Sequence, residues 1–240
     1  MVTNEIRLPV EGVELGGELH WPTKRPGLVL FAHGSGSSRH SPRNQYVARV
    51  LREAGMGTLL FDLLTEEEEE AEAHTRHLRF DIPFLAKRLV AATAWVASEG
   101  RKRTPGTKRT EQASQGGVLP DHGGGLSLGF FGSSTGAAAA LVAAAELGSG
   151  IGCVVSRGGR PDLAGEALAR VKAPTLLIVG GNDGQVVILN EEAYSALRCE
   201  RKLSIVPGAS HLFEEPGMLE QVAAMAAEWF AANLDSRRQS

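Results

Sequence analysis

Cysteine is scarce in this sequence, and its scarcity excludes two kinds of architecture. The 240 residues contain two cysteines, Cys153 and Cys199. Two thiols cannot form a framework of several disulfides or a four-thiolate zinc site. A long apolar run is missing too, since no stretch reaches the roughly 18 residues of a membrane span. Residues 1–10 carry charges instead of the apolar core of a secretory leader. We therefore expect no membrane association and a cytoplasmic protein.

An excess of basic residues is also absent. Lys and Arg number 25 against 28 Asp and Glu, which gives a net charge of -3. Nucleic-acid binders need positive charge to displace counterions from phosphates, so we expect no nucleic-acid partner. A hydrophobic content of 42% with 22% charged residues is typical of a folded core. We expect one domain over 1–240, with a flexible surface loop at 100–125 and a disordered tail at 235–240.

Short apolar runs alternate with helical patterns along the chain. Continuous apolar runs such as 27–33 are typical of strands buried on both faces of a sheet. The predicted strands are 6–10, 13–21, 27–33, 57–62, 126–132, 151–155, 174–180 and 201–206. The predicted helices are 44–54, 80–98, 137–147, 162–171, 191–197 and 218–233. This alternation predicts an α/β fold with a mainly parallel central sheet and helices on both faces.

A run of five glutamates at 66–70 does not fit this alternation. We expect it to be solvated, as a loop or as the first turn of a helix. No neighbouring residues support a metal site there, and we assign no metal to the chain.

Two Gly-x-Ser-x-Gly patterns compete for the role of nucleophile, centred on Ser127 and Ser134. The pattern forms a nucleophile elbow only between a strand and a helix, where the serine lies in a strained turn above the sheet. Loop residues precede Ser127 and strand residues follow it. Ser134 lies between the predicted strand 126–132 and the predicted helix 137–147. We therefore predict Ser134 as the nucleophile, and the alternative is that Ser133 and Ser134 cap the helix.

A serine hydroxyl needs a base, and the base needs an acid that orients it. After a nucleophile elbow the partners follow in the order acid and then histidine. His211 is the one histidine after Ser134, and it follows the last predicted strand. Asp183 lies on a tight loop just after the predicted strand 174–180, at the edge of the sheet where such folds bind ligands. Most other acidic residues of the interval lie on predicted helices, so we assign Asp183 as the acid.

Backbone amides near the nucleophile would form an oxyanion hole. Thr135 directly follows the nucleophile, and its N–H is the first donor. The second donor would come from the loop that follows the strand 27–33, and we assign it to Ser35, with Gly36 as the alternative. His33 precedes the elbow and breaks the order of the triad, so we expect a structural role for it.

These motifs together resemble the α/β-hydrolase family, specifically its dienelactone-hydrolase-like branch. The resembling segments are 33–36, 132–136, 181–183 and 208–211. The resemblance implies the hydrolysis of ester or lactone bonds through an acyl-enzyme, without a cofactor. Dienelactone hydrolase itself uses a cysteine nucleophile, and a serine in its place favours a general carboxylesterase that acts on small-molecule esters. Relatives with a lid insert it where this chain has only a short gap, from 155 to 162, so we expect no lid domain.

Arg157 follows the predicted strand 151–155, which places it near the predicted pocket. Its guanidinium could bind a substrate carboxylate, or it could tie loops together through backbone carbonyls.

Other functions of the protein also stay open. The same triad serves amidases, thioesterases and acyltransferases, and a silent binding module or a nucleotide-binding protein could share the fold. Segment 33–38 lacks the third glycine of a dinucleotide fingerprint, which weakens the last reading. We expect a monomer or a homodimer.

Overall fold

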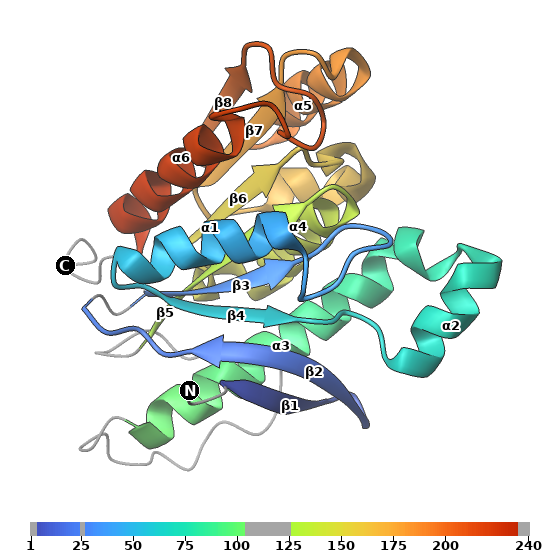
Figure 1. Cartoon of the computed structure of the whole chain (residues 1–240), viewed down its shortest axis with the longest axis vertical. Helices are drawn as coiled ribbons and strands as arrows, with labels where there is room; N and C mark the ends of the chain where they lie inside the picture. The colour runs from blue at the N-terminus through green and yellow to red at the C-terminus, as the bar shows by residue number, and fades with distance from the viewer. Residues whose placement is uncertain (1–3, 25–26, 104–125, 235–240) are drawn as a thin grey trace.

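The computed structural model describes residues 4–24, 27–103 and 126–234 (Figure 1). The predicted tail at 235–240 and most of the predicted loop at 100–125 lie outside the described residues.

Eight strands of the described residues form one sheet, in the spatial order β1-β2-β4-β3-β5-β6-β7-β8. Strands β1 and β2 form a hairpin, β2 pairs antiparallel with β4, and all pairs from β4 to β8 are parallel. The strands are β1 Glu5–Val10, β2 Val13–His20, β3 Gly27–Ala32, β4 Gly57–Phe61, β5 Ser127–Ser133, β6 Cys153–Arg157, β7 Thr175–Gly180 and β8 Arg201–Val206. The predicted α/β fold with a mainly parallel sheet is therefore confirmed.

Helices cover both faces of the sheet, with α1 and α6 on one side and α3 and α4 on the other (Figure 1). The α-helices are α1 Pro42–Glu53, α2 Glu66–Thr75, α3 Ile82–Arg103, α4 Thr135–Leu147, α5 Gly184–Ala196 and α6 Met218–Asn233. The short 3-10 segments are η1 Leu78–Phe80, η2 Gly148–Gly150 and η3 Pro161–Arg170.

Strand β3 shows why its apolar run is continuous. Successive side chains of a strand point to opposite faces of the sheet. Val29 and Phe31 pack in the core with α1 and α6, whereas Leu28 and Leu30 pack in the core with α3 and α4. Both faces of the strand are buried, so polar and apolar residues do not alternate along it.

The structure corrects the bounds of several predicted elements. Helix α3 continues to Arg103, so residues 100–103 are helical instead of forming the start of a loop. Helix α5 begins at Gly184, seven residues before the predicted start at 191. The segment predicted as a helix at 162–171 is 3-10 structure, interrupted at Gly165, where φ is 51°.

The five glutamates open helix α2 instead of lying in a loop. Thr65 is the N-cap of α2, and its hydroxyl accepts the Glu68 N–H while the Glu68 carboxylate accepts the Thr65 N–H. This capping box satisfies two amides of the first turn, and acidic residues there complement the helix dipole. No helix within the described ranges is long and apolar enough to cross a membrane.

Candidate active site

The parallel strands bring the predicted site residues to one edge of the sheet. Ser35 follows β3, Ser134 follows β5, Asp183 follows β7 and His211 follows β8, while Arg157 is the last residue of β6. Carboxyl ends of parallel strands meet at the same edge, which is where open α/β sheets bind ligands. The order of the sheet therefore places β3 on one side of Ser134 and β6, β7 and β8 on the other.

Ser134 lies in a strained turn between β5 and α4. Its φ is 51° and its ψ is -124°, a backbone conformation that costs a non-glycine residue about 1–3 kcal/mol. A Cβ on Gly132 would lie 2.4 Å from Ala137 Cα, and one on Gly136 would lie 2.2 Å from the Ala32 carbonyl oxygen. Both flanking glycines are therefore required by close backbone contacts.

The reading of Ser134 as a simple helix cap finds no support in its contacts. Ser134 is the residue before α4, but its side chain makes no capping hydrogen bond. Its backbone is instead held by β6 and the loop after it. Ser134 N–H donates to the Arg157 carbonyl at 3.3 Å, and the Ser134 carbonyl accepts the Arg160 N–H at 3.0 Å. Ser127 begins β5, seven residues or roughly 20 Å away at the other edge of the sheet.

His211 and Asp183 form a hydrogen-bonded pair. The distance from His211 Nδ1 to Asp183 Oδ2 is 2.6 Å, and the histidine side chain is 39% exposed. Because Nδ1 is used by the carboxylate, Nε2 is the nitrogen available to a substrate or nucleophile. Within the described residues, no hydrogen bond joins Ser134 Oγ to the His211 imidazole. Such bonds are often long without substrate and tighten in the complex.

The loops that carry Asp183 and His211 are tied to each other. Asn182 N–H donates to the Ala209 carbonyl at 2.9 Å, and Asn182 Nδ2 donates to the Gly208 carbonyl at 3.0 Å. Glu215 accepts the Ser210 N–H at 3.1 Å. Neither Asn182 nor Glu215 was assigned a role from the sequence. The place of Asn182 directly before the assigned acid could have indicated that it holds this loop.

The oxyanion candidates lie against Ser134. A Cβ on Gly34 would lie 2.9 Å from Ser134 Cβ, so the loop after β3 touches the elbow. Ser35 N–H donates to Thr135 Oγ1 at 3.1 Å, and the two hydroxyl oxygens lie 3.0 Å apart. The Gly36 N–H has no hydrogen-bond partner in the part of the chain that the structure describes. Thr135 is the first residue of α4, so its own N–H is a free first-turn amide.

His33 is held as a neutral structural residue. Its Nε2 accepts the Leu63 N–H at 3.1 Å, and its Nδ1 lies 3.0 Å from the Gly34 carbonyl oxygen, to which it donates. Burial lowers the pKa of His33, which favours the neutral ring. This agrees with the structural role expected from its place before the elbow.

Arg157 is buried beside the elbow. Its side chain is 6% exposed, and within the described residues its Nε and Nη1 are buried without a hydrogen-bond partner. Burial, with a smaller contribution from Arg43, lowers the pKa of Arg157 to about 10. The guanidinium therefore does not tie loops together through carbonyls in the described chain. A buried positive charge of this kind calls for an anion.

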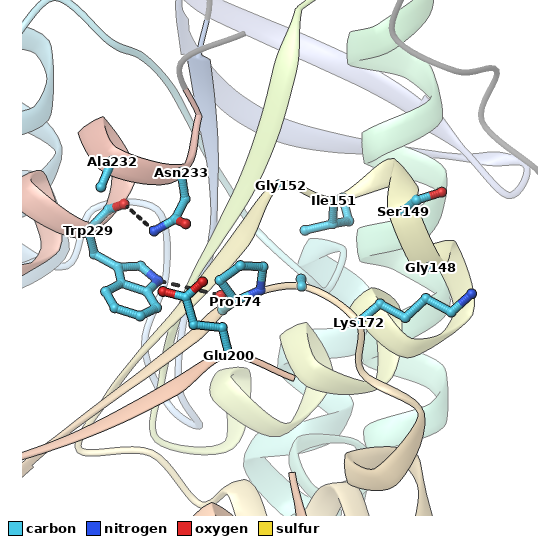
Figure 2. Close-up of a pocket in the computed structure, with 11 residues that line it drawn as sticks. Gly148, Ser149, Ile151, Gly152, Lys172, Pro174, Glu200, Trp229, Ala232 and Asn233 are labelled. Carbon is cyan, nitrogen blue, oxygen red and sulfur yellow. Dashed lines mark hydrogen bonds between the residues drawn. The ribbon is translucent and has the colours of Figure 1, made fainter. Parts of the chain in front are cut away.

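A cavity of about 440 Å³ lies at the other end of the strands, where β6, β7 and β8 begin. Its lining residues include Gly152, Pro174 and Glu200, which directly precede β6, β7 and β8 (Figure 2). Trp229 Nε1 donates there to the Pro174 carbonyl at 3.4 Å. Its walls hold no serine–histidine pair, and we do not place the chemistry there. The described residues also contain no cluster of three or more side chains suited to a metal ion.

A mainly parallel sheet with a strained serine elbow and a His–Asp pair at its carboxyl edge defines the α/β-hydrolase class of protein. No protein-family model matches the chain. The solved structure of dienelactone hydrolase from Anabaena variabilis is 52% identical, with a TM-score of 0.84, over 97% of this chain and 98% of that chain. The chain therefore belongs to the dienelactone-hydrolase-like branch of the α/β-hydrolase superfamily.

More distant structures share the fold. A member of the α/β serine hydrolases without lid from Xanthomonas campestris is 20% identical, with a TM-score of 0.71, over 97% of this chain and 95% of that chain. Est1E from Butyrivibrio proteoclasticus is 15% identical, with a TM-score of 0.71, over 96% of this chain and 99% of that chain.

Curated relatives from Mycobacterium tuberculosis carry the name "Putative phosphoribosyl transferase". They are 50% identical over 230 residues, which are 96% of this chain and 46% of the relative. The chain thus spans about half the length of the curated relatives it matches.

Proposed function

We propose that this protein is a serine hydrolase that cleaves small carboxylic esters or lactones through an acyl-enzyme. The observation that carries the proposal is the strained Ser134 turn at the same sheet edge as the His211–Asp183 pair. Strain of this kind persists only where the surrounding structure imposes it, and it is concentrated at functional sites.

Ser134, His211 and Asp183 would each have one role in the reaction. Ser134 Oγ attacks the carbonyl carbon while His211 Nε2 takes its proton. The same imidazole then gives the proton to the leaving alcohol, and water repeats the cycle to release the acid. Asp183 holds the ring through Nδ1 and stabilises the imidazolium.

The oxyanion would be bound by the amides of Thr135 and Ser35. Ser35 N–H donates to Thr135 Oγ1, so the oxyanion would replace that hydroxyl as the acceptor. The unpaired amide of Gly36 is the alternative donor. Removing one such donor typically lowers kcat about 10²- to 10³-fold.

Arg157 would bind an anionic group of the substrate. Arg157 lies on the β6 side of the elbow. The next residue, Gly158, packs against His211, since a Cβ added to Gly158 would lie 2.9 Å from the His211 carbonyl oxygen. The leaving alcohol must also lie near His211, because His211 protonates it. We therefore assign the anionic group to the alcohol part of the ester.

Labelling with a fluorophosphonate and locating the modified peptide tests the function. We expect the adduct on Ser134 in the folded protein. Ser134→Ala should lose essentially all turnover, on the order of 10⁴-fold or more in kcat, and Ser127→Ala should keep it, with both variants melting near the wild-type temperature. An adduct on Ser127, or full activity in Ser134→Ala, overturns the assignment.

A further inference from the structure

A small cavity of about 20 Å³ lies directly beside the proposed oxyanion amides. Its near wall is the loop of residues 34–36 together with Thr135. The other lining residues are His33, Leu63, Leu64 and Leu85, which form what we call the far wall, and the charged residues Glu69, Glu72 and Arg79, which form what we call its end. A space of this size holds one or two water-sized groups. We call it the acyl slot.

The far wall of the acyl slot is firmly held. Leu63 and Leu85 are buried in the core between the sheet and α3, and Leu63 N–H is fixed on His33 Nε2 at 3.1 Å. Leu64 is 6% exposed. The three leucines therefore cannot move aside by a simple rotation of an exposed side chain, and the exposed side chain that lines the slot is that of Glu69.

The end of the acyl slot is fixed by ion pairs. Glu72 is only 3% exposed, pairs with Arg79 and accepts the Leu78 N–H at 2.7 Å. Helix α2, which carries Glu72, is attached to α3 by Arg88, whose Nη2 lies 2.7 Å from Glu68 Oε1. Opening the slot at this end would expose or break a buried ion pair, which is costly.

We propose that the acyl slot receives the acyl chain of the substrate and restricts it to a short chain, acetyl or propionyl. This inference rests on the proposed serine-hydrolase function. The carbonyl oxygen must lie at the amides of residue 135 and of residue 35 or 36, and these residues form the near wall of the slot. The acyl substituent on the same carbonyl carbon then extends past that wall.

The order of the sheet separates the two parts of the ester. The slot lies on the β3 and β4 side of Ser134, since Leu63 and Leu64 follow β4. His211 lies on the β8 side, and it must protonate the leaving oxygen. The alcohol part therefore leaves toward the half-exposed histidine, and the acyl part occupies the slot.

Two ester series measure the restriction. The first series, p-nitrophenyl acetate, butyrate and hexanoate, changes only the acyl chain, and we expect kcat/KM to fall at least about 10-fold from acetate to hexanoate. The second series, methyl, butyl and hexyl acetate, changes only the alcohol, and we expect less than about a 3-fold fall, because this side is open. Equal kcat/KM for acetate and hexanoate in the wild type overturns the proposal.

Leu64→Ala is the decisive variant, because it lengthens the slot without touching the amides. We expect it to reduce the acetate-to-hexanoate ratio of kcat/KM at least about 10-fold and to leave the alcohol series unchanged. Leu168→Ala is the matched control, since Leu168 is a similarly buried leucine of the same core that does not line the slot. It should keep the wild-type ratio, and Leu64→Val replaces Leu64→Ala if the larger truncation does not fold.

The outcomes separate this inference from the proposed function. A fluorophosphonate adduct on Ser134 with no effect of Leu64→Ala or Leu64→Val on the acyl ratio overturns the slot alone. A change in the alcohol series instead of the acyl series also overturns it, because the slot would then hold the leaving group. No adduct and no ester turnover overturn the function and the slot together.

Discussion

Replacing Arg157 by methionine removes a buried charge that has no counter-ion in the described chain. Its Nε and Nη1 are buried without a partner among the described residues. The fall of the Arg157 pKa from its ordinary value to about 10 corresponds to about 3 kcal/mol against the charged form in the folded protein. Burial is the larger cause and the Arg43 charge the smaller one. Arg157 therefore destabilises the fold unless an anion accompanies it.

Arg157→Met should raise the free energy of unfolding at pH 7 by about 1–3 kcal/mol, because methionine fills similar space without a charge. For a domain of this size, Tm rises about 2–4 °C per kcal/mol. Arg157→Lys is the control, and it should give no such gain. The destabilisation by the arginine is fully present below about pH 10 and diminishes as the pH rises from there toward the ordinary pKa of arginine, because the folded state loses its proton first.

The same variant separates a binding role from a structural one. Phenyl acetate and 4-acetoxybenzoate share the acetyl group, but only the second has a carboxylate on the alcohol part. Arg157→Met should lower kcat/KM at least about 10-fold more for 4-acetoxybenzoate than for phenyl acetate. Equal losses for both esters would refute the anion site. A fall in the free energy of unfolding of more than about 1 kcal/mol would refute the reasoning on the buried charge.

Two further predictions concern the framework of the site. Gly136→Ala should abolish folded protein, because the added Cβ would lie 2.2 Å from a backbone oxygen. Gly184→Ala is the control, since a Cβ there would meet nothing within 4 Å. It should change the free energy of unfolding, measured by urea titration, by less than about 1 kcal/mol. Glu72→Gln should lower that free energy by about 1–3 kcal/mol at pH 7. Burial raises the pKa of Glu72, but hydrogen bonds from Arg79 and backbone amides lower the pKa by more, so the net shift is downward. The ionised Glu72 therefore stabilises the folded state above pH 4.5, and this stabilisation is lost in acid. A difference between wild type and Glu72→Gln that persists at pH 3 would contradict this.

The elbow could be predicted from sequence because its determinants are local. The glycines at 132 and 136, the strand before them and the alanine-rich helix after them lie within about twenty residues. The proximity of Asp183 and His211 could be predicted because parallel topology brings the carboxyl ends of the strands to one edge. Local pattern and topology together identified the edge, and the structure added the 2.6 Å contact within the His–Asp pair.

The surroundings of Ser134 could not be predicted in this way. The contact of Ser35 with Thr135 joins residues 100 positions apart. The acyl slot requires helix α2 to be attached to α3 through Arg88, and a run of glutamates gives no hint of that partner. Arg157 follows a strand in the sequence, but its lack of partners depends on everything packed around it.

The two sides of Ser134 differ in chemistry because different strands flank it. Toward β4 the lining residues are leucines, the Glu72–Arg79 ion pair and the exposed Glu69, which suits a small acyl group without a negative charge. Toward β6 the buried guanidinium of Arg157 has no counter-ion in the described chain, and His211 is half-exposed. An ester with a short acyl chain and an anionic alcohol satisfies both sides at once, whereas the reversed arrangement would place a carboxylate against the buried Glu72 and leave Arg157 without an anion. In the proposed function, the sheet order would thus set the direction in which the substrate lies across Ser134.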